Sequence, residues 1–372
     1  MRVGVPREVK NNENRVGLAA AGVYELVNRG HEVVVETGAG VGAGVTDDEY
    51  RAAGATILDS ADKVWEQADL IVKVKEPLEE EYERMREGQL LFTYLHLAAN
   101  KPLAEALMER RITSVAYETV QLPNRSLPLL APMSAIAGRL ATQVAAYHLM
   151  SPLGGSGKLM GGVPGTDEAK VVVIGGGVVG EQAAIMARGL HANVTVMDVN
   201  VSRLNEISTV HNGDILTRYS SKLDVTELVT GADVVIGSVL IPGRRAPKLV
   251  TDEMVSQMKP GAVLVDVAID QGGCFENSKP TTHDAPTFKV HDAVYYCVAN
   301  MPGSVPNTAT KALNNATIPY VVKLANSQGL DALKQDSALA KGLHTYDGKL
   351  YHDGTAEAHG IEVAPLEDVL ES

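Results

Sequence analysis

Three side chains in the N-terminal part of the chain, Arg15, Lys75 and His96, could act together on a small substrate that carries a carboxylate. Histidine exchanges a proton near neutral pH, so His96 suits proton transfer. The planar fork of an arginine matches a carboxylate, and the ammonium of a lysine is a compact charge for a carboxylate or carbonyl oxygen. Asp270, much later in the chain, could assist with water or ammonia. These residue types suit hydride transfer at a carbon that bears nitrogen or oxygen.

Each of these residues also has a structural interpretation that its position alone does not exclude. Lys75 precedes Glu-Pro and could be a solvated residue at the end of a strand. His96 follows an apolar run and could be a structural histidine with satisfied hydrogen bonds. Asp270 precedes Gln-Gly-Gly and could cap a turn. The functional interpretation therefore depends on elements that bring these residues together.

Short apolar runs alternate with amphipathic segments around these residues. The alternation is typical of βαβ units about a parallel sheet, with strands expected at Val3–Val5, His31–Glu36, Asp69–Val74, Leu90–Leu95 and Ile112–Tyr117 and a helix at Leu18–Arg29. Lys75 and His96 would each end a strand, and Arg15 would begin the helix after the first strand. All three could then face one crevice.

A glycine-rich turn further along the chain suggests a dinucleotide site. The strand-like run Lys170–Ile174 leads directly into a G-x-G-x-x-G pattern, and the helix-compatible stretch Glu181–Leu190 follows. Gly175 would allow the tight turn, Gly177 would let a pyrophosphate approach the backbone, and Gly180 would let helix and strand pack closely. A glycine loop without a ligand is the alternative, but strand, turn and helix coincide here as the motif requires.

The next strand carries the residue that distinguishes NAD from NADP. Asn193–Met197 is followed by Asp198, whose carboxylate would bind the adenine ribose hydroxyls and repel a 2′-phosphate. NAD is therefore the predicted cofactor, although Arg203 lies close enough in sequence to weaken that preference. Val234–Ile236 and Ala262–Val265 are runs typical of strands buried on both faces.

Two linkers bracket this second region. The Ala-rich segment Ser134–Met150 is expected to be an inter-domain helix with Ser134 as its N-cap, and Ala309–Ala325 is a second helix, followed by an acidic, polar tail. We expect an α/β protein of two doubly wound Rossmann-like domains that flank a central cleft and are joined by long helices. Residues 129–306 would bind NAD, and residues 1–128 with 307–372 would form a discontinuous substrate domain.

Composition narrows the class of protein. A chain of 372 residues favours two domains, and its net charge of −13 disfavours nucleic acid as a partner. Two cysteines cannot supply a disulfide framework, which favours the cytoplasm. No signal-peptide pattern and no run of about 18 apolar residues is present, so neither secretion nor a membrane is expected.

The chain resembles the bacterial alanine dehydrogenases, which share ancestry with the NAD-binding subunit of proton-translocating transhydrogenase. The resemblance covers essentially the whole chain, and its motifs stand at Gly4–Val16, Val72–Pro77, Thr93–Ala98, Ala131–Ser134, Gly161–Gly165, Asp266–Gly273 and Asn300–Thr308. It implies NAD-dependent conversion of L-alanine to pyruvate and ammonia, reversibly, by a homohexamer whose domains close over the cofactor.

The resemblance also implies roles for particular residues. Arg15 and Lys75 would hold the substrate, and His96 and Asp270 would be the catalytic pair. The residues implied at the NAD site, beyond the glycines, are Ser134, Asp198, Arg203, Ser220, Val239, Leu240, Val267, Ala268, Ile269, Asp270, Lys279, Val298, Ala299, Asn300 and Met301. Lys279 stands where some relatives have arginine, and would contact a phosphate as a point charge.

No metal site is predicted. Some relatives bind magnesium through a glutamate and a later histidine; Glu118 matches the first, but Ser327 occupies the second position. In the predicted reaction, Cα of alanine loses hydride, water attacks the iminium, and His96 shuttles the proton as the carbinolamine collapses. The alternatives are a carboxyalkyl amino-acid synthase or saccharopine-type dehydrogenase, an NAD-binding transhydrogenase module, and a non-catalytic NAD sensor.

Overall fold

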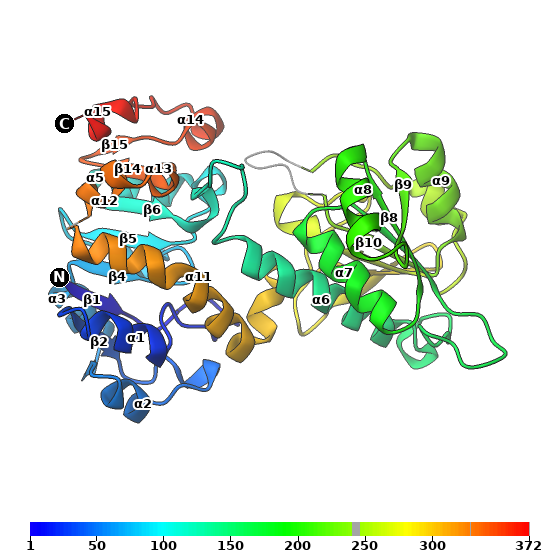
Figure 1. The fold of residues 1–372 in the computed structure, drawn as a ribbon, viewed down its shortest axis with the longest axis horizontal. Coiled ribbons are helices and arrows are strands. Elements are labelled where there is room, and N and C mark those ends of the chain that lie inside the picture. Colours follow the sequence, from blue (N-terminus) through cyan, green and yellow to red (C-terminus); the bar gives the residue numbers. More distant parts are fainter. Residues whose placement is uncertain (240–245, 328, 372) are drawn as a thin grey trace. The chain divides into compact units, whose positions relative to one another are not determined.

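The computed structural model describes residues 1–239, 246–327 and 329–371, and the chain divides into two compact units (Figure 1). Unit 1 comprises Met1–Met133 and Gly303–Ser372, and unit 2 comprises Ser134–Pro302. Each unit contains a largely parallel β-sheet with helices packed on it. The predicted α/β class with two Rossmann-like units is confirmed.

The sheet of unit 1 has eight strands in the order β15-β14-β6-β5-β4-β1-β2-β3. Strands β1 to β6 run parallel to one another, whereas β14 is antiparallel to β6 and β15 is antiparallel to β14. Their bounds are β1 Arg2–Val5, β2 Glu32–Glu36, β3 Thr56–Leu58, β4 Leu70–Val72, β5 Leu90–Thr93, β6 Thr113–Ala116, β14 Leu343–Tyr346 and β15 Lys349–Leu350.

Helices cover this sheet because each buries an apolar stripe against it. Trp65 of α3 and Leu107 of α5 share one buried cluster with Ile71 and Leu91 of the strands. Helix α11 also packs against α1, as Figure 1 shows. The helices of unit 1 are α1 Ala20–Val27, α2 Asp47–Ala52, α3 Ala61–Gln67, α4 Glu79–Tyr82, α5 Lys101–Glu109, α11 Pro306–Asn326, α12 Leu330–Gln335, α13 Ser337–Ala340, α14 Asp353–His359 and α15 Glu367–Leu370, with 3₁₀ turns η1 Val41–Ala43, η2 Leu97–Ala99 and η3 Tyr117–Thr119.

Unit 2 contains a seven-stranded sheet in the order β12-β13-β11-β10-β7-β8-β9, parallel except for β12. Successive residues of β7 enter opposite clusters: Val171 and Val173 lie in one, Val172 and Ile174 in the other. A strand buried on both faces has a continuous run of apolar residues, so the sequence of β7 predicts a strand directly.

The strands of unit 2 are β7 Lys170–Ile174, β8 Asn193–Asp198, β9 Leu216–Tyr219, β10 Val234–Gly237, β11 Val263–Asp266, β12 Thr287–Val290 and β13 Ala293–Tyr296. Its helices are α7 Val178–Gly189, α8 Val201–Val210, α9 Lys222–Gly231 and α10 Asp252–Ser256, with 3₁₀ turns η4 Ser151–Leu153 and η5 Val267–Gln271. Helix α6 Ala131–His148 and the turn η6 Met301–Ser304 each span a boundary between the units.

Two predictions about local structure are wrong. Ser134 is not an N-cap but lies inside α6, because the helix begins at Ala131 and a proline at position 132 is well tolerated in a first helical turn. The C-terminal segment is not a simple polar tail: it forms α12 to α15 and the strands β14 and β15, and β14 joins the sheet of unit 1. Each of these elements has at most seven residues, so no long apolar period marks them.

Within the described residues, no helix is both long enough and apolar enough to cross a membrane.

Candidate active site

The strand order of unit 1 reverses between β1 and β4. From β1 the chain proceeds through β2 and β3 on one side, whereas β4, β5 and β6 lie on the other. Ligands of open α/β sheets bind outside the carboxyl ends of the strands at such a switch point. The loops that follow β1, β4 and β5 carry Arg15, Lys75 and His96, respectively. The topology therefore places the three candidate residues at one edge of one sheet.

All three residues lie somewhat beyond the positions expected for them. Arg15 is in the loop after β1 and does not begin a helix, since α1 starts at Ala20. Lys75 does not end a strand, since β4 stops at Val72 and Lys75 lies three residues further on. His96 does not end a strand either, since β5 stops at Thr93. In all three cases a loop carries the side chain past the end of the strand.

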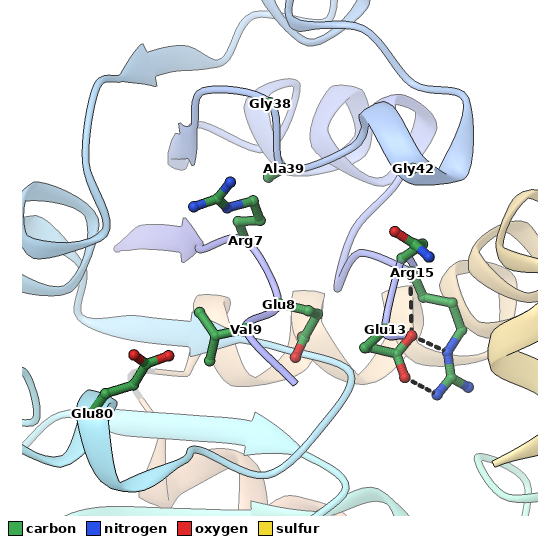
Figure 2. A pocket seen from close by; sticks show the side chains of 10 residues that line it. Arg7, Glu8, Val9, Glu13, Arg15, Gly38, Ala39, Gly42 and Glu80 are labelled. Carbon is green, nitrogen blue, oxygen red and sulfur yellow. Dashed lines mark hydrogen bonds and ion pairs between the residues drawn. The ribbon is translucent and has the colours of Figure 1, made fainter. Parts of the chain in front are cut away.

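The guanidinium of Arg15 is buried and paired with the carboxylate of Glu13 (Figure 2). Nε donates to Oε1 at 2.6 Å and Nη2 to Oε2 at 2.5 Å, while Nη1 contacts Sδ of Met133 at 3.1 Å. A two-point pair of this kind fixes the plane of the guanidinium. Glu13 engages Nε and Nη2 of the guanidinium, and Nη1 faces Met133.

A cavity of about 460 Å³ lies beside this pair. Besides Glu13 and Arg15 it is lined by Arg7, Glu8, Val9, Asn14, Gly38, Ala39, Gly42 and Glu80, which come chiefly from the loops after β1 and β2 (Figure 2). Charged side chains of both signs surround it, so its chemistry fits a small zwitterion better than an apolar ligand.

Buried charges fix the segment that carries Lys75. The ammonium of Lys73 is fully buried between Glu8, at 3.2 Å, and Glu81, at 2.8 Å. Oε1 of Glu8 also accepts the amide of Val74 at 2.6 Å. Burial raises the pKa of Glu8 above its ordinary value, against the opposing effect of Lys73. The backbone immediately before Lys75 is thus held by a salt-bridge network with almost no solvent exposure.

His96 lies on a strained turn between β5, which ends at Thr93, and η2, which begins at Leu97. Its φ is +49°, in the left-handed region that non-glycine residues rarely adopt. The carboxylate of Glu118 accepts the amides of Leu95 and His96, the latter at 2.7 Å, and lies 3.9 Å from Nδ1 of the imidazole. The ring stacks on Tyr94 with centroids 6.0 Å apart, and its side chain is 45% exposed. The imidazole is therefore oriented by its surroundings and still accessible.

Glu76 links two of the candidate residues electrostatically. Burial would raise the pKa of this carboxyl, but Lys75, Lys10 and His96 together lower it below its ordinary value. Lys75 and His96 thus act on the same carboxylate, which agrees with their common position at the carboxyl edge. Lys10 is ion-paired with Glu76 directly.

Three residues at this edge escaped the sequence interpretation: Glu13, Glu8 and Tyr94. Glu13 stands two residues before Arg15, and an acid so near a candidate arginine was the one available signal. Nothing local marked Glu8, whose partners Lys73 and Val74 are 65 and 66 residues away in the sequence. Tyr94 was read as part of a strand, but its hydroxyl donates to the carbonyl of Leu129 at 2.6 Å.

In unit 2 the glycine turn lies between β7 and α7. Gly175 has a φ of +106°, and a Cβ on Gly180 would lie 1.8 Å from the carbonyl oxygen of Gly175. A Cβ on Gly177, by contrast, would meet no atom within 4 Å. Gly177 is exposed and precedes α7, whose N-cap offers no side-chain hydrogen bond to the first amides. The turn is therefore tight where helix and strand pack, and open where an anion would approach.

Asp198 ends β8 beside this turn. Its Oδ2 accepts the amide of Gly176 at 2.6 Å, and its Oδ1 accepts the amide of Asn200 at 2.8 Å. Arg203 donates from Nε to the carbonyl of Gly176 at 2.7 Å and is ion-paired with Glu181 and Glu206. Two carboxylates thus already engage the guanidinium that could have favoured a 2′-phosphate.

The other residues expected at the NAD site follow the carboxyl ends of the parallel strands of unit 2. Ser220 follows β9, Val239 follows β10, Val267 to Asp270 form most of η5 after β11, and Val298 to Met301 follow β13. Lys279 lies between β11 and β12 with its ammonium 4.5 Å from the ring centroid of Phe288, and Ser134 lies on α6. Leu240 lies outside the described residues.

Asp270 is exposed on a turn that one buried carboxylate organises. Asp266 caps η5 by accepting the amide of Ala268, and it also accepts the amide of Cys274 at 2.9 Å and the hydroxyl of Ser278 at 2.5 Å. Burial raises the pKa of Asp266. This residue, to which the sequence assigned no role, holds both the turn that carries Asp270 and the segment leading to Lys279.

These features define a two-unit α/β protein with a dinucleotide-type turn in one unit and a cationic, histidine-bearing edge in the other. Comparison with known proteins identifies it further. Residues 4–137 match the family description "Alanine dehydrogenase/PNT, N-terminal domain", and residues 141–353 match "Alanine dehydrogenase/PNT, C-terminal domain". The chain belongs to this family, and the resemblance read from its motifs is confirmed.

The chain is also similar to individual proteins whose names agree with this family. The chain is 60% identical to an alanine dehydrogenase of Mycolicibacterium smegmatis, over 96% of each sequence. A solved structure titled L-alanine dehydrogenase shares 54% identity and a TM-score of 0.94, over 97% of this chain and 99% of that one. A solved transhydrogenase from Sinorhizobium meliloti shares 27% identity and a TM-score of 0.81, over 95% and 99%.

Proposed function

We propose that this chain catalyses the NAD-dependent oxidative deamination of L-alanine to pyruvate and ammonia, together with the reverse reductive amination. The observation that carries the proposal is full-length identity of more than half with proteins named alanine dehydrogenase. The gathering of Arg15, Lys75 and His96 at the switch point of unit 1 supports it independently.

The carboxyl edge of unit 2 fits NAD. The open face of Gly177 would leave room for a pyrophosphate, the first turn of α7 would offer amides to it, and Asp198 would bind the ribose hydroxyls. Ser220, Val239, Lys279 and the segments 267–270 and 298–301 would line the remainder of the cofactor. When bound, NAD supplies the acceptor for the hydride that leaves Cα of the substrate.

The residues of unit 1 would hold the amino acid and move its protons. Arg15 would receive the substrate carboxylate, and Lys75 would bind a carboxylate or carbonyl oxygen. Water attacks the iminium carbon, and the carbinolamine then loses ammonia. His96 would take the proton from the carbinolamine hydroxyl as the C–N bond breaks, and Asp270 would assist with water or ammonia.

The proposal is tested with purified protein, L-alanine and NAD at alkaline pH. NADH formation that depends on alanine is expected, and a His96→Ala variant should lose it by about 10²-fold or more. A panel of oxo acids and amines in the reductive direction separates this activity from that of a carboxyalkyl amino-acid synthase or saccharopine-type dehydrogenase. Dependence on a second amino acid in place of ammonia, or NAD binding without any amino-acid turnover, would contradict the proposal.

We also propose that the protein works in the cytoplasm as a homohexamer. Family resemblance supports the hexamer, and the scarcity of cysteine supports a reducing compartment. Sedimentation of the purified protein as a monomer or dimer at micromolar concentration would contradict the hexamer.

A further inference from the structure

The turn that carries His96 is held from both sides by groups outside it. On the N-terminal side, Glu118 accepts the amides of Leu95 and His96. On the C-terminal side, the carbonyl oxygen of Leu97 accepts a hydrogen bond from Nε2 of His359 at 2.6 Å. A non-glycine residue in the left-handed region persists only where its surroundings determine it, and these two contacts do so here.

His359 is the last residue of α14, which packs against η2, the 3₁₀ turn that begins directly after His96 (Figure 1). The start of α14 is fixed by His352, whose Nδ1 accepts the amide of Thr355 at 3.2 Å. Thr355 and Ala356 are buried, and β14 and β15 tie the segment before α14 to β6. The ring of His359 is therefore presented to Leu97 by a helix anchored at its other end.

The contact has a defined chemistry. A carbonyl oxygen can only accept, so Nε2 of His359 carries a proton, and the ring is a donor in its neutral and its protonated form alike. The acceptor belongs to the residue directly after His96. Loss of the donor would thus release the backbone on one side of the strained residue without touching the imidazole itself.

We propose that His359 is a positioning residue for the reaction: by holding the carbonyl of Leu97, it keeps His96 in its left-handed conformation and its imidazole in place. The inference rests on the catalytic role proposed above for His96. It assigns a part in the chemistry to a helix of the C-terminal segment, which the sequence predicts only to be a polar stretch of the substrate domain.

The test compares His359→Leu, which removes the donor, with His359→Gln, whose side-chain amide retains a donor at a similar reach. Alanine oxidation is measured with full steady-state kinetics for both substrates. His359→Leu should lower kcat by about tenfold or more, since small displacements of a catalytic group are costly, while KM for NAD stays unchanged. His359→Gln should keep most of the parental kcat.

A matched control is His31→Leu. His31 is a partly buried histidine of the same unit whose Nε2 also makes one hydrogen bond, to Oδ1 of Asn326 at 2.8 Å. This variant should retain the parental kcat, so that a general loss of one histidine contact is distinguished from loss of the contact to Leu97.

Three outcomes overturn the inference. One is parental kcat in His359→Leu; another is an equal loss of kcat in the Leu and Gln variants, because then the donor is not what matters. The third is a fall in His31→Leu as large as that in His359→Leu. A His96→Ala variant run in parallel keeps the two proposals apart: if it retains parental turnover, the role of His96 is wrong and that of His359 with it, whereas an inactive His96→Ala beside an active His359→Leu refutes only the role of His359.

Discussion

The carboxylate of Glu13 grips the guanidinium of Arg15 along one edge, with both partners almost completely buried. A buried arginine that is to bind a substrate carboxylate needs a fixed orientation and a compensating charge when no substrate is present. Glu13 supplies both. The carboxylate of Glu13 thus compensates the buried charge of Arg15 in the absence of substrate.

Replacing Glu13 by Gln should destabilise unit 1 and weaken substrate binding. Removal of one member of a buried ion pair leaves the other uncompensated, which costs about 3–5 kcal/mol. The effect can be followed in urea through the fluorescence of Trp65, the only tryptophan in the chain, which is buried in unit 1. KM for alanine should rise because the guanidinium loses its two-point support.

The exposed pair of Asp48 and Arg51 provides the control for this prediction. Its atoms are 2.7 Å apart, closer than the buried contacts of Lys73 at 2.8 and 3.2 Å, yet the carboxylate side chain is 92% exposed. Asp48→Asn should leave the unfolding midpoint and KM for alanine unchanged, since solvent screens such pairs. Equal effects in the two variants would show that burial is not what gives the Glu13 pair its importance.

The second and third glycines of the motif, Gly177 and Gly180, should respond differently to alanine. In Gly180→Ala the new Cβ would collide with the carbonyl of Gly175, so unit 2 should lose stability and solubility. In Gly177→Ala the Cβ meets nothing within 4 Å, so the fold should be unaffected. KM for NAD should nevertheless rise about tenfold or more, because the methyl group occupies the space into which a pyrophosphate comes. A Gly177→Ala protein with parental KM for NAD would place the cofactor elsewhere.

His344 should make unit 1 sensitive to acid. The residue is buried, its Nε2 lies 3.1 Å from the hydroxyl of Thr119, and its ring stacks on His352 at 4.1 Å. Burial, with smaller effects of His352 and His96, holds the pKa of His344 well below 6.5. Below about pH 6.5, His344 binds a proton in the unfolded chain but stays neutral in the folded chain. The contribution of the neutral, buried His344 to stability is therefore complete above that pH and is lost as the pH falls.

Unfolding of parent and His344→Phe in urea, followed by Trp65 fluorescence from about pH 8 to pH 5, measures this contribution. The free energy of unfolding of the parent should fall more steeply with decreasing pH than that of the variant, by up to about 1.4 kcal/mol per pH unit. Phenylalanine keeps a ring against His352 but cannot titrate. Parallel profiles would show that another group, such as His352, whose pKa burial also lowers, dominates.

The parts of the fold that could be read from the sequence are those in which one local pattern decides the structure. Val171–Ile174 is apolar because both faces of β7 are covered, and the predicted bounds of the strand, Lys170–Ile174, are those observed. The glycine turn could be predicted because a tight turn and a closely packed helix both require glycine. Asp198 could be predicted because a carboxylate at the end of the next strand suits ribose hydroxyls. The short elements after residue 326 were missed, since β14 depends on pairing with β6, more than 200 residues earlier.

In the candidate site, too, some residues could be predicted from the sequence and others could not. Arg15, Lys75 and His96 carry reactive groups and could be proposed from their types, whereas the residues that hold them could not. Glu8, Glu118 and His359 support them through contacts with backbone amides or carbonyls at distant positions. Any polar side chain could make such contacts, so residue type alone gives no signal for them.

The choice of cofactor should depend on the charge of Asp198 and on the pairing of Arg203. Asp198→Asn keeps an acceptor for the amide of Gly176 but removes the charge that opposes a 2′-phosphate. We expect kcat/KM with NAD to fall about tenfold, or about 1.4 kcal/mol, and only a modest gain with NADP, because Glu181 and Glu206 still engage Arg203.

Adding Glu206→Gln should loosen the arginine and raise activity with NADP further, whereas Glu206→Gln alone should leave NAD kinetics near those of the parent. Kinetics of all three variants with both dinucleotides decide the matter: a parent that uses NADP as well as NAD, or a double variant that gains nothing over Asp198→Asn, would contradict this account of cofactor preference.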